Sequence, residues 1–182
     1  EKGRGQSPKV TVPLTHEMEM MTMPEALLWE HMTVKEVREA LENTTQTILI
    51  PLGVTEQHGY HLPLRMDCYN CEEISIRAAE QCGCFVAPTL AYTYSGGELP
   101  GTINVSPHVV TQIMVEILHS LCLQGLQNLI IVLGHGGSEN DVATQDAAEM
   151  FLRNNPQFSD RNIGVYRFWT KSPLCQKAFE DG

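Results

Sequence analysis

The chain has 182 residues, 42% of them hydrophobic and 19% charged, and a formal net charge of −10. This length suffices for one domain with a hydrophobic core, and the composition is that of an ordinary globular protein. The acidic balance argues against nucleic acid or an anionic membrane as a partner, because phosphate binding requires a basic face. No segment approaches the roughly 20 apolar residues of a membrane span, and no signal-peptide pattern is visible, so we expect a cytoplasmic protein.

Residues 1–25 carry few periodic signals and are expected to form an N-terminal arm, flexible or packed against the surface. The domain that follows, residues 26–182, alternates apolar runs with helical periodicities. Thr33 and Glu36 have the spacing of a capping box, which starts the first helix. The expected elements, in chain order, are the helix 33–42, the strand 47–52, the helix 68–82, the strand 84–89, the helix 107–124, the strand 129–133, the helix 138–154 and the strand 163–168.

Strands that are apolar throughout, separated by amphipathic helices, predict an α/β fold with three layers, a mostly parallel sheet covered by helices on both faces. In such sheets the ligand lies outside the carboxyl ends of the strands. Residues with metal-binding or titratable side chains that directly follow a strand are therefore the first candidates for a functional site.

Two carboxylates and two imidazoles lie within twelve residues directly after the first long strand. Glu56 and His58 are two residues apart, so in an extended segment they face the same way. Asp67 comes eleven residues after Glu56 and could fold back from the start of the next helix. Oxygen and nitrogen donors of this kind suit a divalent metal such as zinc or manganese.

Each of these residues also has a simpler interpretation. Asp67 could be a helix N-cap, a position that Asp favours, and His58 and His61 could be ordinary loop histidines. The segment Gly134–Gly137, which contains His135, could be a tight turn that needs glycine for backbone freedom. Because both groups follow strands, however, a shared metal site at the carboxyl end of the sheet is the favoured interpretation.

Three segments, in this order and spacing, resemble signature motifs of the creatininase (creatinine amidohydrolase) family. The first resembles that family's main signature, the second its Phe-Pro-Gly-Thr element and the third its Asn-Gly-His-Gly-Gly-Asn element. The resemblance covers about residues 30–170. The three segments are Glu56-Gln57-His58-Gly59-x-His61-Leu62-Pro63-Leu64-x-x-Asp67, Leu99-Pro100-Gly101-Thr102 and Gly134-His135-Gly136-Gly137.

The resemblance implies a metal-dependent amidohydrolase that cleaves a non-peptide C–N bond, of a cyclic amide or formamide type, with hydroxide formed at the metal. It implies two divalent ions (zinc, manganese or iron), a small-molecule amide substrate and a homo-oligomer, often a hexamer. Carried over position by position, the metal ligands become Glu56, His58, Asp67 as a bridging ligand, and His135. The substrate-side residues become Ser95, Gly96, Gly97 and Gly136.

The chain also departs from the family pattern. Leu133 and Ser138 stand where the family has Asn, and Gly137, which cannot ligate, stands where creatininase itself has Glu. The family's His-Ala-Gly-x-x-Glu-Thr-Ser element, which supplies its catalytic His, is not found before Gly182, so the domain as given is expected to lack it. Either the sequence is incomplete, which we favour because Lys171 to Asp181 resembles the helix leading into that element, or the chain is a degenerate member of the family. His61 is then the nearest candidate for proton transfer, with loop stabilisation by hydrogen bonding as its other role. A catalytically inactive binding or scaffold subunit is the alternative function.

Six cysteines are spread over the sequence. We expect reduced, packed thiols, because disulfide scaffolds are usually shorter and poorer in core. A zinc or redox module built from the first four is the alternative, but a helix between the two pairs would hold them about 15–20 Å apart. The cysteines are Cys68, Cys71, Cys82, Cys84, Cys122 and Cys175.

Overall fold

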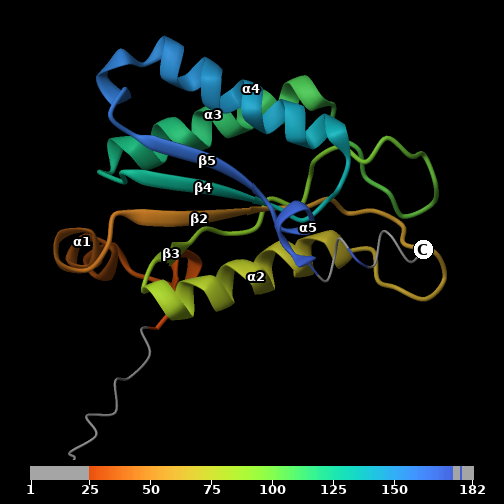
Figure 1. Ribbon diagram of the computed structural model, residues 1–182, viewed down its shortest axis with the longest axis horizontal. Coiled ribbons are helices and arrows are strands. Elements are labelled where there is room, and N and C mark those ends of the chain that lie inside the picture. Colours follow the sequence, from red (N-terminus) through yellow and green to blue (C-terminus); the bar gives the residue numbers. More distant parts are fainter. Residues whose placement is uncertain (1–24, 174–176, 178–182) are drawn as a thin grey trace, which may run out of the picture.

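The computed structural model describes residues 25–173 and residue 177. Five parallel strands form one sheet in the order β1-β3-β2-β4-β5 (Figure 1). The strands are β1 (Leu27–Leu28), β2 (Thr47–Leu52), β3 (Phe85–Val86), β4 (Asn128–Leu133) and β5 (Asn162–Arg167). The helices are η1 (Trp29–His31), α1 (Val34–Asn43), α2 (Met66–Cys82), α3 (Pro107–Leu123), α4 (Ser138–Asn154), η2 (Pro156–Phe158) and α5 (Phe168–Lys171).

The sheet lies between helices on both faces, with α3 and α4 on one side and α2 on the other (Figure 1). The predicted three-layer, parallel α/β fold is therefore confirmed. Thr33 caps α1 as expected, with the reciprocal hydrogen bonds of a capping box to Glu36. In the described residues, no helix is long and apolar enough to cross a membrane.

The alternation of side chains along β2 explains why both faces are covered. Successive residues of a strand point to opposite faces. Ile48, Ile50 and Leu52 pack into the larger core beneath α3 and α4, whereas Leu49 packs into the smaller core beneath α2. Burial of apolar surface on both faces, worth roughly 25 cal/mol per Å², holds the three layers together.

One predicted strand, 84–89, is wrong in extent. Only Phe85 and Val86 form a strand, although the chain still follows β2, with the Ala87 N–H donating to the Leu49 carbonyl (2.9 Å). Pro88 has no N–H to donate, so it interrupts the ladder at this point. The strand predicted at 163–168 also ends one residue earlier, because Phe168 begins α5. Residues 1–24 of the predicted arm lie outside the described part of the chain.

Candidate metal centre

The candidate site lies where two neighbouring strands end. β2 and β4 pair in parallel along their whole length, so that Leu52 and Leu133 are partners at their carboxyl ends. The helices that follow them, α2 and α4, cover opposite faces of the sheet (Figure 1). In an open parallel sheet the usual ligand position lies between chains that diverge in this way, and we call this position the crevice.

Two glycines let the start of α2 approach this crevice closely. A Cβ on Gly134 would lie 2.0 Å from the backbone oxygen of Asp67, and a Cβ on Gly53 would lie 2.7 Å from the backbone nitrogen of Cys68. Both distances are impossible for a real side chain. Glycine at these positions therefore brings Asp67 against the ends of β2 and β4.

Donor atoms from two loops, one after β2 and one after β4, converge on Asp67, whose side chain is 7% exposed. His135 Nδ1 lies 3.0 Å from Asp67 Oδ2 and 3.0 Å from Glu56 Oε2. The candidate ligand atoms of Glu56, Asp67 and His135 all lie within 4.8 Å of one another. In the part of the chain that the structure describes, this is the group of three that could hold a metal ion.

The chemistry of these donors fits a divalent cation. Of the two short contacts of His135 Nδ1, only that with Asp67 has hydrogen-bond geometry. The buried Glu56 Oε2 is therefore left without a hydrogen-bond partner among the described residues. A buried carboxylate oxygen without a partner is costly. A cation among two carboxylates and an imidazole would satisfy this oxygen and match the ligand preferences of zinc or manganese.

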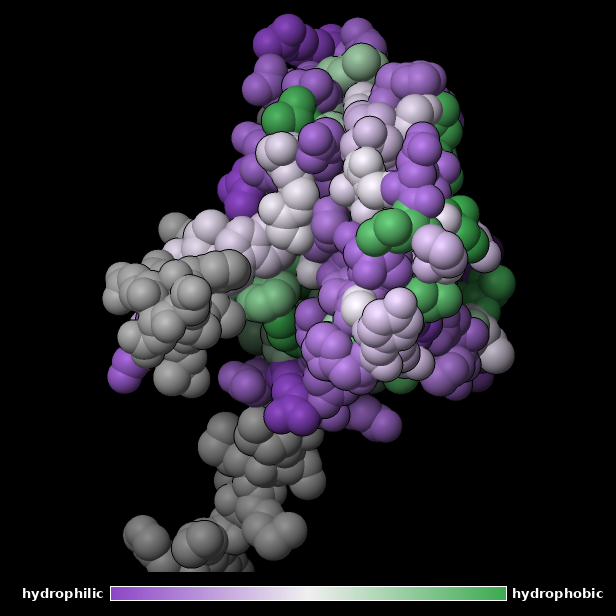
Figure 2. All heavy atoms as spheres, turned by 90° about the vertical axis from the view of Figure 1, so that its right-hand side faces the viewer, coloured by the Kyte–Doolittle hydropathy of each residue, from purple (hydrophilic) through white to green (hydrophobic). Residues whose placement is uncertain are grey.

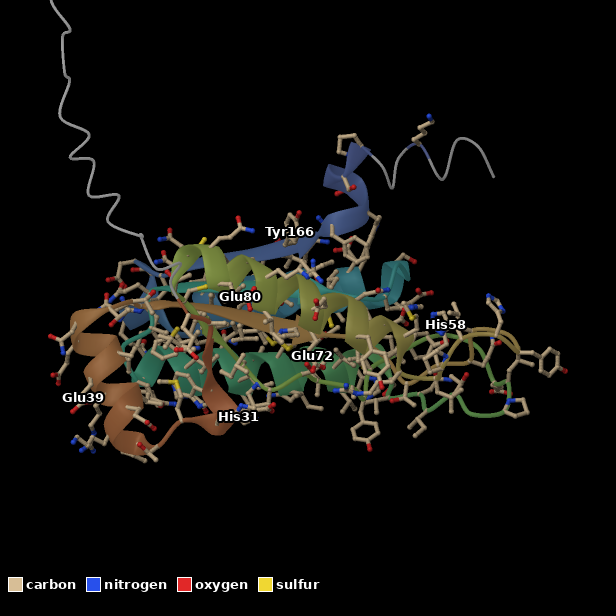
Figure 3. All side chains as sticks on the ribbon, turned by 90° about the horizontal axis from the view of Figure 1, so that it is seen from below. His31, Glu39, His58, Glu72, Glu80 and Tyr166 are labelled. Carbon is tan, nitrogen blue, oxygen red and sulfur yellow. The ribbon has the colours of Figure 1, made fainter. Side chains whose placement is uncertain are left out.

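His58 approaches the other oxygen of Asp67. Its Nε2 lies 3.2 Å from Asp67 Oδ1, and its Nδ1 lies 3.1 Å from the backbone oxygen of Glu56. Figure 3 labels His58 in the loops beyond the start of α2. The structure thus brings all four predicted donors together, with His58 outside the compact group of three and on the opposite carboxylate oxygen.

The position of Asp67 excludes its simpler interpretation. The N-cap of α2 is Arg65, and Asp67 lies inside the first turn without capping the helix. Its two oxygens face the two histidines instead. A carboxylate in the first turn is also favoured by the helix dipole.

The electrostatics of the crevice act on His135. Burial alone would lower its pKa, but the hydrogen bond and the charge of Asp67, with the charges of Glu56 and Glu139, outweigh burial and raise the pKa. These negative charges therefore favour the protonated ring when no metal is bound. A metal ion must displace this proton, since imidazole ligates in its neutral form.

Comparison with known proteins places this geometry in a family. Residues 30–180 match the family model described as "Creatininase: Creatinine amidohydrolase". The chain belongs to the creatininase family. The predicted resemblance is therefore confirmed over most of the chain.

The relatives of this family member include several hydrolases. A creatinine amidohydrolase of Pseudomonas putida is 25% identical over 88% of this chain and 65% of its own length. A mycofactocin precursor peptide peptidase of Mycobacterium tuberculosis H37Rv is 34% identical over 54% of this chain and 43% of its own length. The chain thus spans less than two thirds of the curated relatives it matches. A solved structure named "Creatininase Mn" has a TM-score of 0.77 at 24% identity, and covers 87% of this chain and 65% of that one.

The Asn104 side chain holds the loop predicted to face the substrate by three hydrogen bonds. Its side-chain oxygen accepts from the N–H groups of Ser95 (2.9 Å) and Gly96 (3.3 Å), and its amide nitrogen donates to the Gly97 carbonyl (2.6 Å). Gly136 follows His135, and a Cβ there would meet no atom within 4 Å. Gly136 therefore lies beside open space. Contact of the substrate with Ser95, Gly96, Gly97 and Gly136 stays a prediction.

His61 does not join the four donors. Its side chain is exposed, and it makes no side-chain hydrogen bond within residues 25–173. Its predicted role in holding the loop by hydrogen bonding is therefore not seen, and proton transfer stays a prediction.

Figure 2 looks onto this end of the molecule, where hydrophobic side chains lie in patches among polar ones.

Sequence reasoning missed a residue that fixes the donor loop at its far end. Glu72, labelled on α2 in Figure 3, accepts from Arg65 (2.9 Å) and from the Thr89 hydroxyl (3.2 Å). These contacts join the end of the loop that carries His58 to α2 and to the loop after β3. No spacing in the sequence indicates them, because a glutamate on a helix is normally a solvated residue.

The cysteines form no metal module in the described residues. Cys68 and Cys71 are buried near the start of α2, whereas Cys82 ends that helix and is exposed. Cys71 and Cys82 are eleven residues apart on this helix, which at about 1.5 Å per residue separates the two pairs by about 16 Å. Burial raises the pKa of Cys71 to about 12, so this thiol stays protonated and packed.

Proposed function

We propose that this creatininase-family chain provides the metal site of a divalent-metal-dependent amidohydrolase. The observation that carries the proposal is the convergence of Glu56, Asp67 and His135 within 4.8 Å, with the buried Glu56 Oε2 lacking a hydrogen-bond partner. Two related solved structures, "Creatininase Mn" and a creatininase mutant described as "Zn-Zn type", have manganese and zinc in their names and support a divalent ion.

The proposal includes two ions with Asp67 as the bridging ligand. Asp67 Oδ2 faces His135, which also contacts Glu56, whereas Asp67 Oδ1 faces His58. One ion would be held by Glu56, Asp67 and His135, and a second by Asp67 and His58 with further donors. The contacts of both Asp67 oxygens, one with each histidine, support this arrangement.

A bound divalent ion supplies Lewis acidity, which lowers the pKa of a ligating water toward about 7 and polarises a carbonyl. The residues of this chain prepare the crevice for that chemistry. His135 must lose its proton to ligate, and Asp67 orients both imidazoles through its two oxygens. The open space beside Gly136 would receive the substrate carbonyl.

We propose a non-peptide C–N bond, of a cyclic amide or formamide type, as the bond that is cleaved. The similarity to a creatinine amidohydrolase over 88% of this chain supports this choice. A peptide bond is the second candidate, favoured by 34% identity to a peptide peptidase over a shorter region. Homo-oligomerisation, as in a hexamer, and a cytoplasmic location stay predictions that light scattering and cell fractionation would test.

Metal content and hydrolysis together test the proposal. The purified chain, loaded with Mn²⁺ or Zn²⁺ and desalted, should retain metal by elemental analysis. Glu56→Gln should retain less, because a neutral amide replaces a carboxylate that is proposed to bind the ion. Glu80→Gln, on the exposed surface of α2, is the matched control and should retain the wild-type amount. Activity on lactams and formamides but not on peptides would support the non-peptide assignment. Cleavage of peptides alone would replace it with the second candidate, and equal metal content in all three chains would contradict the metal site.

A further inference from the structure

A buried chain of hydrogen bonds links the loop after β2, the loop after β3 and the first turn of α4. Asn140 lies in the first turn of α4 and Thr93 in the loop between β3 and α3, and both are 0% exposed. The Asn140 side chain accepts from the Tyr94 N–H (3.1 Å) and donates to the Tyr94 carbonyl (2.8 Å) and to Thr93 Oγ1 (3.1 Å). Thr93 Oγ1 in turn donates to the Gly53 carbonyl (2.6 Å).

This chain of bonds uses the full donor capacity of both side chains. The amide of Asn140 employs both hydrogens and its oxygen, and the hydroxyl of Thr93 donates once and accepts once. A shift of either side chain would leave a buried polar group without a partner. The bonds therefore fix the distance between the loops and do not merely fill space.

The two ends of the chain of bonds lie close in sequence to the proposed metal ligands. Gly53 precedes Glu56 by three residues, and Asn140 follows His135 by five. Few rotatable bonds separate each ligand from the residue that is fixed. The separation of Glu56 from His135 is therefore coupled to the Asn140–Thr93 contact.

Backbone bonds extend this coupling along the Glu56 loop. The Gly53 N–H donates to the Leu90 carbonyl (3.0 Å), and the Thr55 N–H donates to the Ala91 carbonyl (3.0 Å). The segment before Glu56 is thus paired with the segment before Thr93. A displacement of Thr93 would be passed to the Glu56 loop through these bonds.

We propose that Asn140 and Thr93 are positioning residues that set the metal affinity of the site by fixing the Glu56 loop relative to the His135 loop. The inference rests on the proposed function, since it presupposes that Glu56 and His135 bind a divalent ion. Neither side chain has to touch the ion. Residues that orient metal ligands typically change metal affinity by about 10–100-fold when they are replaced.

The test compares the same substitution at two buried threonines. Thr93→Val removes the hydroxyl at nearly constant volume, and Thr93→Ser keeps it. Thr144→Val is the matched control, because Thr144 is also 0% exposed, lies one turn further along α4, and donates only to the carbonyl of Asp141 (2.9 Å). Affinity for Mn²⁺ is measured by titration calorimetry on the intact chain.

We expect Thr93→Val and Asn140→Ala to bind Mn²⁺ about 10–100-fold more weakly, and Thr93→Ser and Thr144→Val to bind like the wild type. Should Asn140→Ala fail to fold, the Thr93 pair carries the test. Equal affinity of Thr93→Val and the wild type would overturn this inference alone. Equal losses in Thr93→Val and Thr144→Val would overturn it as well, by showing general loosening. A wild-type chain that binds no Mn²⁺ would overturn the proposed function, and this inference with it.

Discussion

The core beneath α3 and α4 and the carboxyl end of the sheet are held together by different interactions. Buried side chains in the core are apolar, and Phe151 stacks on Phe158 with ring centroids 5.8 Å apart. The carboxyl end instead holds the buried polar residues Asp67, Thr93 and Asn140, joined to its loops by hydrogen bonds. Apolar burial is not directional, whereas hydrogen bonds are. The core should therefore determine the stability of the fold, and the carboxyl end the placement of donors.

The largest expected effect is on stability, from truncation in the core. Phe151→Ala removes a fully buried ring that contacts Phe158 and His119. We expect the free energy of unfolding to fall by about 3–5 kcal/mol, as for other Phe→Ala changes in cores. Urea denaturation measures it. The variant that remains folded should keep its affinity for Mn²⁺, and a loss of affinity would show that the two regions are not separable.

At the crevice, where Asp67 contacts both histidines, we expect substitutions to change the metal content rather than the stability. Asp67→Ala should remove both ions, because it deletes the proposed bridging ligand, whereas His58→Ala should remove mainly one. Elemental analysis of metal-loaded, desalted variants measures the ratio of metal to protein. Equal loss in both variants, or no loss in either, would contradict the bridging arrangement.

A pH dependence should follow from the raised pKa of His135 in the metal-free chain. A pKa raised on folding adds stability that is complete below the unfolded-state pKa, near 6.5, and is lost as pH rises through the higher folded-state pKa. The metal-free chain should therefore lose stability over this window, and His135→Gln should not. Affinity for metal should change oppositely, falling as pH drops through the same window. Urea denaturation from pH 6 to 9, with and without metal, measures both the stability and the effect of metal on it. Identical slopes of the unfolding free energy against pH for the metal-free wild type and His135→Gln would contradict the assignment.

The smallest expected effect concerns the thiols. Among the five described cysteines, Cys82 is exposed, whereas Cys68, Cys71, Cys84 and Cys122 are buried with raised pKa values. In a Cys175→Ser chain, which limits labelling to these five, a thiol reagent should modify one cysteine quickly under native conditions. Cys82→Ser should abolish this fast phase without changing metal content. Fast labelling that persists in Cys82→Ser would contradict the packed-thiol interpretation.

The sequence predicts much of this fold because its signals are local. Apolar runs, helical periodicities and the capping box at Thr33 each depend on neighbouring residues, and the helix 33–42, the strand 47–52 and the helix 107–124 form close to where they are expected. The strand after Cys84 was overestimated because the effect of Pro88 on pairing depends on its neighbour in the sheet. Local signals therefore predict the positions of helices and strands more accurately than the pairing of the strands.

The site is predictable only in part, for the same physical reason. The four donors follow strand ends, so the rule for parallel sheets brings them together. Asn140 and Thr93 are 47 residues apart and show no pattern, and their contact exists only in the folded chain. Glu72 likewise gains its partners Arg65 and Thr89 through tertiary packing. Ligands can thus be inferred from a motif, whereas the residues that position them require the structure.

One measurement tests the central claim most directly, namely anomalous X-ray diffraction from crystals of the chain loaded with Mn²⁺ or Zn²⁺. The metal-site account predicts an anomalous peak in the crevice, about 2.0–2.3 Å from Glu56 Oε2, Asp67 Oδ2 and His135 Nδ1. A second peak between Asp67 Oδ1 and His58 would establish the two-ion form. A crevice with no peak at full metal loading, or a peak at Cys68 and Cys71 instead, would contradict the account.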